Sequence, residues 1–332
     1  MATGTATLDT ASSRNLWSGK KMRRVREIGL GYLLLAPALI ILIVFEFLPV
    51  FYGLYISMCN WKLSCTQFIG ADNFTRAFDD PDMWNALTTT ITYSAISVPL
   101  QLGLGLLIAY LLFQKIRGKD WFRVLFFLPY ITSTVASAAI WGYLYSPDRG
   151  LINTILKSLG LPGLKWLGES KGIFYIMAQN AGVDIPSWLN GPSLALIALI
   201  IYTTWVFVGY DIAIFLAGMG NISPELYEAA KIDGASGWKL FRHITIPLLS
   251  PTTFFLLILT VIGTFKAFNH IYVMTRGGPG NATSTMGVFI FQQMYESQRY
   301  GYSAALSFIL FAIILLLTIL QNRFAGERVV YD

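Results

Sequence analysis

The chain has 332 residues, of which 55% are apolar and only 13% are charged, and its formal net charge is +6 at neutral pH. Ordinary soluble domains carry roughly 25% charged residues, so this composition indicates a membrane protein. The basic residues lie in short stretches between apolar runs. This distribution argues against nucleic-acid binding and fits contact with anionic lipid head groups.

Six apolar segments are long enough to cross the hydrocarbon core of a bilayer, which takes about 20 helical residues. We expect an all-α integral membrane protein rather than a barrel, because no segment alternates apolar and polar residues. The predicted transmembrane helices are 28–58, 85–113, 124–145, 193–220, 251–274 and 302–321. The remaining segments are an N-terminal tail (1–27), external loops (59–84 and 146–192), a polar connection (221–250) and a C-terminal tail (322–332).

The basic residues also predict the orientation of these helices. The apolar run after the tail is far longer than the core of a signal peptide, so we expect a retained anchor. With both termini in the cytoplasm, the cytoplasmic segments hold 15 of the 24 Lys and Arg residues, whereas the external segments, although longer in total, hold eight. By the positive-inside rule this count predicts an N-in, C-in topology.

The connection 221–250 has the pattern of two short helices joined by a sharp turn. Ser223 is a good N-cap and Pro224 suits the first helical position. Gly234 can adopt the left-handed conformation that ends a helix, and we expect Pro247 to stop the second helix. The segment is too polar to enter the bilayer.

This connection resembles the EAA loop of permease subunits in binding-protein-dependent ABC importers. Glu228-Ala229-Ala230 is followed after three residues by Gly234 and, nine residues later, by Ile244-Thr245-Ile246-Pro247, with Ile246 where Leu is usual. The resemblance implies that a coupling helix docks in a groove of a cytoplasmic ATPase subunit. The coupling residues it implies are Glu228, Ala229, Ala230, Asp233 and Gly234. The alternative interpretation is a plain helical hairpin between two spans.

Further motifs resemble the carbohydrate-importer branch of that family. The resemblance makes 85–321 the permease core and implies a bacterial or archaeal cell membrane, a second similar permease, two ATPase subunits and an external sugar-binding protein. No Walker motif occurs, so we expect a transport subunit that is not an enzyme, with ATP and Mg bound by partner chains. An extra stretch at 170–191 departs from the pattern. The motifs are Phe127-Leu128-Pro129, Gly150-Leu151-Ile152-Asn153, Phe215-Leu216-Ala217-Gly218, Ile232-Asp233-Gly234-Ala235 and Gly277-Gly278-Pro279-Gly280.

Charges inside the spans indicate where substrate passes, because such charges usually face a cavity or one another. Asp211 and Lys266 are the candidates, and the resemblance adds Gly209, Tyr210 and Asn269 as residues of the substrate path. A structural Asp211–Lys266 ion pair is the alternative. The expected cargo is a sugar or oligosaccharide, and a polyol or a glycerol-phosphate-like solute is the alternative cargo.

The sequence offers little for other functions. An integral membrane enzyme would need clustered acid–base residues, and none is evident, so we expect no catalytic residue. His243 and His270 are too few for a metal cluster, and we interpret them as loop or interface residues. Cys59 and Cys65 lie in an external loop where a disulfide is permitted, but their spacing does not establish one and we expect free thiols.

Overall fold

The computed structural model describes residues 12–62, 64–114, 116–180, 182–186, 189–324 and 326. Residues 1–11 of the predicted tail 1–27, and residues 325 and 327–332 of the predicted tail 322–332, lie outside the described residues. The chain divides into two compact units, Met1–Ile56 and Ser57–Asp332.

The first unit is a long helical segment, made of α1 (Ser12–Leu42), η1 (Ile43–Phe47) and α2 (Leu48–Ser57). The stretch Met22–Ser57 is long and apolar enough to cross a membrane, which agrees with the predicted span 28–58. The helix begins earlier than that span, and an Arg23–Glu27 ion pair of 2.9 Å at i,i+4 spacing supports the added turns.

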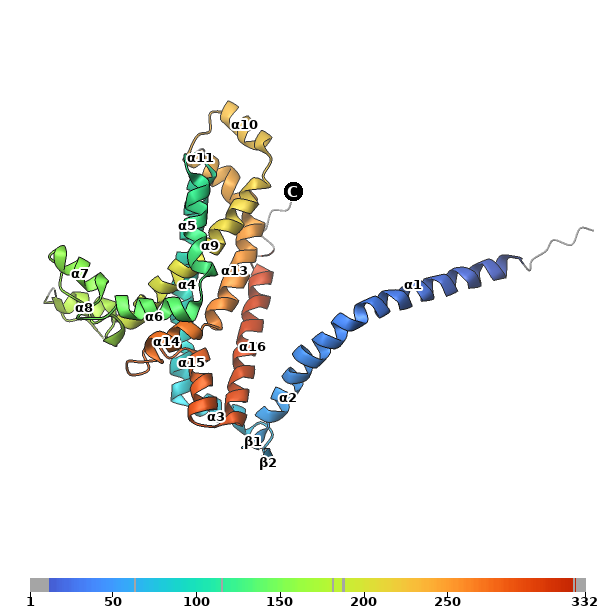
Figure 1. Cartoon of the computed structure of the whole chain (residues 1–332), viewed down its shortest axis with the longest axis horizontal. Coiled ribbons are helices and arrows are strands. Elements are labelled where there is room, and N and C mark those ends of the chain that lie inside the picture. The colour runs from blue at the N-terminus through green and yellow to red at the C-terminus, as the bar shows by residue number, and fades with distance from the viewer. Residues whose placement is uncertain are drawn as a thin grey trace, which may run out of the picture. The chain divides into compact units, whose positions relative to one another are not determined.

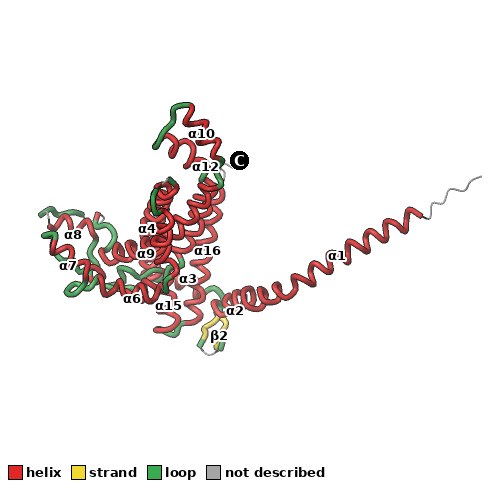
Figure 2. Tube along the Cα trace, turned by 45° about the horizontal axis from the view of Figure 1, so that its top comes forward, coloured by secondary structure: helices red, strands yellow, loops and turns green. Residues whose placement is uncertain are grey.

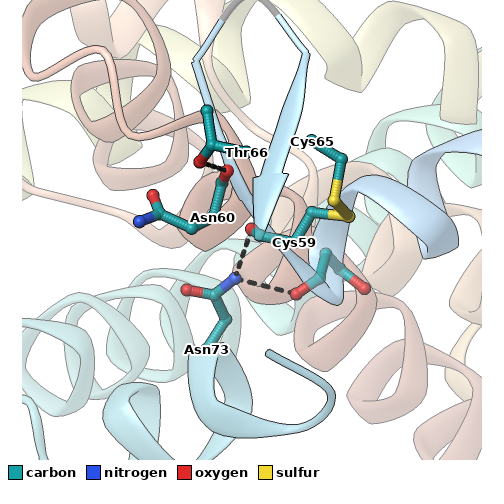
Figure 3. Close-up of a disulfide and its surroundings, with 6 residues drawn as sticks. Cys59, Asn60, Cys65, Thr66 and Asn73 are labelled. Carbon is teal, nitrogen blue, oxygen red and sulfur yellow. Dashed lines mark hydrogen bonds between the residues drawn. A yellow bond between two sulfur atoms is a disulfide. The ribbon is translucent and has the colours of Figure 1, made fainter. Parts of the chain in front are cut away.

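A small hairpin opens the second unit. Strands β1 (Cys59–Trp61) and β2 (Cys65–Phe68) pair antiparallel, and a disulfide joins Cys59 to Cys65, so the expectation of free thiols is wrong. The pairing brings the two cysteines close together, which the spacing in the sequence could not show. Figure 3 shows Asn73, from the following helix α3 (Asp72–Asp79), reaching back to this hairpin. Its Nδ2 donates to the carbonyl oxygens of Ser57 at 2.8 Å and Cys59 at 3.2 Å.

The rest of the second unit is a bundle of long helices. Helices α4, α9, α13 and α16 run side by side (Figures 1 and 2). Within the described residues of the whole chain, five helical segments are long and apolar enough to span a membrane, and a bent pair makes a sixth if its two helices count as one span. The bounds in this unit are α4 (Pro81–Phe113), α5 (Lys119–Ile131), α6 (Thr134–Leu144), α9 (Leu194–Gly220), α13 (Ser250–Phe265), α14 (Asn269–Thr275), α15 (Met286–Phe291), η5 (Gln292–Glu296) and α16 (Tyr300–Phe324).

The predicted span 124–145 is not one continuous helix. Helices α5 and α6 meet at an angle of 97°. Both residues between them, Thr132 and Ser133, have extended backbone angles. The break leaves the Pro129 carbonyl without its usual helical partner. The hydroxyl of Thr132 donates a hydrogen bond of 2.6 Å to that carbonyl. Apolarity alone could not reveal this break, because apolar residues lie on both sides of it.

The predicted span 251–274 is also interrupted. Helix α13 ends at Phe265 and α14 begins at Asn269, so Lys266 stands in the break. The carbonyl of Ala267 accepts a hydrogen bond from the Thr285 hydroxyl at 3.2 Å. A Cβ added to Gly287 would lie 2.8 Å from that same carbonyl oxygen, so α15 approaches the break very closely.

The predicted external loop 146–192 is largely ordered by its own contacts. It holds α7 (Leu151–Ser158), η2 (Trp166–Gly168) and α8 (Ile173–Asn180). Asn153 is buried and bonds three neighbours: its Nδ2 donates to the carbonyls of Pro147 and Leu164, and its Oδ1 accepts from the Trp166 indole. A bridge between Gly172 and Ser193 closes the stretch that contains α8.

The connection 221–250 forms α10 (Pro224–Ile232), α11 (Trp238–Leu240), η4 (Phe241–Thr245) and α12 (Ile246–Leu248). Ser223 caps α10 and Pro224 is its first residue, as predicted. Gly234 has φ +81°, and the hydrogen bonds Gly234 N–H to Lys231 and Ala235 N–H to Ala230 form the expected left-handed C-cap.

The prediction that Pro247 ends the second helix is wrong. Helical structure continues from Trp238 through Leu248, with a turn of π-helix at Phe241–Thr245. In that turn the N–H of Ile246 bonds to the Phe241 carbonyl, five residues back. Pro247 follows directly and is the last residue but one of this helical segment, which ends at Leu248.

Candidate functional site

A cavity of about 370 Å³ lies among α4, α5, α6, α9 and the α13–α14 break. Both interrupted spans contribute to it. Tyr130 and Thr134 come from either side of the α5–α6 break, and Lys266 and Asn269 border the second break. The lining residues share hydroxyl, amide or aromatic groups for the most part. They include Tyr93, Gln101, Thr203, Phe207, Tyr210, Asp211, Thr260, Thr264, Phe268 and His270.

Asp211 is the most buried charged side chain in this lining, at 1% exposure. Its Oδ2 accepts a hydrogen bond from Nε2 of Gln101, on α4, at 2.6 Å. Among the described residues no partner contacts its Oδ1. A buried carboxylate oxygen without a partner is costly, and the side chain of Asp211 is the one carboxylate in the lining of this cavity.

Lys266 lines the same cavity but does not pair with Asp211. Its side chain is exposed, and its backbone N–H donates to Ile262 at the end of α13. The two ion pairs in the described part of the chain are Arg23–Glu27 and Arg123–Asp120. The alternative of an Asp211–Lys266 structural pair is therefore not what the structure contains.

Tyr210 and Gly209 occupy different positions although they are adjacent. The ring of Tyr210 lines the cavity and stacks on Tyr130, with centroids 5.0 Å apart. Gly209 lies outside the cavity, where α9 meets α5, and a Cβ added to it would be 2.0 Å from the Phe126 carbonyl oxygen. Of the five residues predicted for the substrate path, the structure brings four together at one cavity and gives Gly209 a packing contact.

A buried network in the cavity wall was missed by the sequence analysis. The hydroxyl of Tyr93 lies 2.6 Å from the Thr203 hydroxyl and 2.9 Å from Nε2 of His270. The Thr203 hydroxyl is 3.1 Å from the same nitrogen, so the three groups form a closed triangle. His270 is 5% exposed, and its interpretation as a loop or interface residue is wrong. The position of His270 inside a predicted span could have indicated this role, because polar side chains within spans usually face a cavity.

Gln101 was missed for a related reason. The span 85–113 carries no charge, so charged residues within spans gave no indication of its uncharged polar residues. The other histidine, His243, is exposed in the connection, where its ring contacts the Lys239 carbonyl at 3.0 Å, and this agrees with the prediction of a loop residue.

The predicted coupling residues form a separate surface. Helix α10 lies at the end of the bundle opposite α3 (Figure 1). None of its residues is buried, and Glu228, Ala229, Asp233 and Gly234 are all exposed, whereas Ala230 is half-buried. Large apolar side chains on this segment are exposed as well, with Ile232 at 88% and Trp238 at 66%.

Aromatic contacts attach this surface to the end of α4. The ring of Tyr110 lies 4.4 Å from that of Phe241, and its hydroxyl donates to the Gly237 carbonyl at 3.2 Å. The Tyr227 and Thr245 hydroxyls are 3.1 Å apart and join α10 to the returning helix. The connection is therefore held against the bundle while its outer side stays uncovered.

Comparison with known proteins places this geometry in context. Residues 101–327 match the family model described as the binding-protein-dependent transport system inner membrane component. The trehalose/maltose transport system permease protein of Thermococcus litoralis is 33% identical over 307 residues, covering 92% of this chain and 96% of that protein. The sn-glycerol-3-phosphate transport system permease protein of Agrobacterium fabrum is 33% identical over 306 residues, covering 91% of this chain and 96% of that protein.

A solved structure has the same fold. It is that of a bacterial alginate ABC transporter in complex with an alginate pentasaccharide-bound periplasmic protein. One of its chains aligns with a TM-score of 0.75 at 22% identity, covering 92% of this chain and 96% of that chain.

The packing of Gly209 gives a testable prediction. Gly209→Ala should lower the free energy of unfolding by about 1–3 kcal/mol, because the new Cβ overlaps the Phe126 carbonyl. Gly220→Ala, in the same helix with nothing within 4 Å of the new atom, is the matched control and should be neutral or stabilising by up to about 1 kcal/mol. Thermal unfolding in detergent measures both. If the Gly209 variant kept its stability but changed its substrate preference, the packing role would be wrong and Gly209 would belong to the substrate path.

Proposed function

This chain belongs to the family of binding-protein-dependent transport system inner membrane components, and on that premise we propose that it is the permease subunit of an ATP-driven sugar importer. With a second, similar permease it forms the path of a sugar or oligosaccharide delivered by an external binding protein. The observation that carries the substrate class is a cavity lined by hydroxyl, amide and aromatic side chains, with the carboxylate of Asp211 among them.

The chemistry of the cavity suits a neutral sugar. Sugar hydroxyls donate to a carboxylate such as Asp211 and exchange hydrogen bonds with an amide such as that of Asn269, while the Tyr130–Tyr210 stack offers an aromatic face. The volume of about 370 Å³ lies in the range of small-molecule sites, ~300–1,000 Å³. Asp211 and Gln101 hold each other in place, so the acceptor is oriented before a ligand arrives.

A glycerol-phosphate-like solute is the second candidate, and two observations favour it. One relative is named for sn-glycerol-3-phosphate at the same 33% identity as the trehalose/maltose relative, and Lys266 lines the cavity. Asp211 argues against it, because a buried carboxylate repels a phosphate in the same cavity far more strongly than an exposed ammonium group attracts it. The sugar is therefore the better fit. A polyol shares its hydroxyl chemistry.

We further propose that the connection 221–250 couples this chain to a cytoplasmic ATPase subunit. The exposed surface of α10, with Glu228 beside apolar groups such as Ile232, has the character of a helix that lies in a partner's groove. Two ATPase subunits that bind ATP and Mg complete the assembly, and this chain itself performs no catalysis. The family membership and the names of its relatives as permease proteins support this assignment.

The proposed location is the inner membrane of a bacterial or archaeal cell, with both termini in the cytoplasm. The hairpin with its disulfide then lies outside, in an oxidising compartment where such bonds persist. The same orientation places α10 inside, on the side of the ATPase subunits, and α8 outside, on the side of the binding protein.

The cavity assignment predicts different effects for two substitutions of Asp211. Asp211→Asn keeps the shape and the bond to Gln101, so assembly should be intact and uptake of a neutral disaccharide should fall by about tenfold or less. Asp211→Leu leaves the Gln101 amide unpaired and should abolish uptake while reducing stability by about 1–3 kcal/mol. Uptake of labelled sugar and of glycerol 3-phosphate is measured for each variant. A wild type that imports only the phosphate would remove the sugar assignment.

The coupling assignment is tested with a matched pair of charge reversals on one helix. Glu228→Arg should leave membrane insertion and sugar binding unchanged but reduce sugar-stimulated ATP hydrolysis by about tenfold or more, because a contact at the ATPase groove is lost. Glu225→Arg, in the first turn of the same exposed helix, is the control and should change it little. Gly234→Val should act like Glu228→Arg, since a side chain at φ +81° is strained. Equal effects of the two reversals would contradict the assignment.

The orientation is tested with reporters. A reporter fused after Arg328, which lies outside the described residues, should report cytoplasm, and one inserted near Asn180 should report the external side. The basic-residue count is the physical reason. Alkaline phosphatase and green fluorescent protein give opposite signals on the two sides, and the reverse pattern at both positions would overturn the N-in, C-in topology.

A further inference from the structure

A second pocket, distant from the substrate cavity, lies at the end of the bundle where α16 begins. Its volume is about 560 Å³, and the hairpin, α3 and the start of α16 surround it. Figure 1 shows these elements together at the end opposite α10. The lining is basic and aromatic. Its charged members are Lys62, Arg76 and Arg299, and its aromatic members are Trp61, Tyr300 and Tyr302.

The three basic side chains have no acidic partner within the described residues. Neither ion pair of that part of the chain involves Lys62, Arg76 or Arg299. The Arg76 guanidinium lies over the Tyr302 ring, 5.0 Å from its centroid, and the Arg299 guanidinium contacts the Gln293 amide oxygen at 3.5 Å.

The nearest carboxylate is already engaged. Asp80 accepts a hydrogen bond of 2.6 Å from the Tyr302 hydroxyl and another from the N–H of Asp82 at the start of α4. Asp80 is not among the residues that line the pocket. The pocket therefore presents three positive groups, and none of its lining residues is a carboxylate.

The pocket is held in shape by covalent and hydrogen bonds. The Cys59–Cys65 disulfide closes the hairpin that carries Trp61 and Lys62. Figure 3 shows how Asn73, itself a lining residue, ties that hairpin to α3 through the Cys59 carbonyl. The basic groups thus come from three elements that are fixed to one another, so little order is lost when a ligand binds.

The length of α16 places the pocket at the membrane surface. The helix has 25 residues, which at 1.5 Å each measure roughly 38 Å, more than the roughly 30 Å of the hydrocarbon core. Because Tyr300 and Tyr302 stand at the start of this helix, at the edge of the predicted span 302–321, we place them at the level of the lipid head groups. Aromatic and basic side chains are typical of that level.

We propose that this pocket binds the phosphate of an anionic phospholipid in the leaflet where α16 begins. The Arg76 and Arg299 guanidinium groups donate paired hydrogen bonds to phosphate oxygens, and Lys62 adds a point charge. Trp61 and Tyr300 contact the glycerol region. In the proposed orientation this leaflet is the external one. The inference depends only on the position of the pocket at the start of α16, so it holds for either orientation.

A lipid phosphate fits better than a free ion or an acidic protein segment. Head groups are concentrated at the level where the pocket lies, whereas a free anion must be drawn from water that screens it within about 8 Å at physiological salt. A lipid also brings acyl chains that cover apolar side chains. Phe311 and Leu315, farther along α16, are exposed in this unit.

Lipid retention provides the test. The full chain, purified with its associated subunits, is titrated with dioleoylphosphatidylglycerol, and bound lipid is counted by native mass spectrometry. Arg76→Gln and Arg299→Gln should each weaken binding about fivefold, and the double variant about 25-fold, from the loss of one or two surface charges. Arg149→Gln, a basic residue of the other external loop outside the pocket, is the control and should bind as the wild type does.

Other outcomes would overturn the proposal. Equal retention of phosphatidylglycerol by the double variant and the wild type would place the bound lipid elsewhere. Equal affinity for dioleoylphosphatidylcholine would show that binding does not require a net negative charge on the lipid. Displacement of the lipid by millimolar inorganic phosphate or by a glutamate-rich peptide would assign the pocket to a free anion or to a protein partner. Unchanged thermal unfolding of the variants shows that lost binding is not lost folding.

Discussion

Every backbone N–H and C=O group within the hydrocarbon core must find a partner inside the protein, and the rest of this structure depends on that constraint. Four long helices satisfy this constraint through their own backbone hydrogen bonds. Two spans do not, because they break at Thr132 to Ser133 and at Lys266 to Phe268. Broken backbone at membrane depth is tolerated where it is buried in protein or lines a cavity. Both breaks border the same cavity.

Side chains of neighbouring helices complete the hydrogen bonding at these breaks. The Tyr202 hydroxyl donates to the Thr134 carbonyl at 2.9 Å, and the Thr285 hydroxyl donates to the Ala267 carbonyl at 3.2 Å. The unbroken helices add most of the polar lining, with Gln101 on α4 and Thr203 and Asp211 on α9, so the breaks alone do not account for it.

The sequence predicted the spans well because apolar length is a one-dimensional property. It also predicted the cap of α10, since Ser223, Pro224 and Gly234 act through local geometry. The sequence could not predict the breaks, the Gln101 contact or the disulfide, because each of these depends on which segments meet in space. Gly209 shows the limit most clearly. Its neighbour Tyr210 faces the cavity, and only the approach of the Phe126 carbonyl distinguishes the two positions.

The placement of the breaks also bears on the proposed coupling. Helix α9 runs unbroken from Asp211 at the cavity to Gly220, where the connection begins, and α4 touches both regions through Gln101 and Tyr110. A movement of the connection would therefore act on both helices together. The broken α13–α14 span cannot follow rigidly, because no helical hydrogen-bond ladder crosses its break. Under the proposed coupling, a displacement at α10 would change the distance between Asp211, on the unbroken α9, and Lys266, in the break, and the cavity would change shape where a ligand would sit.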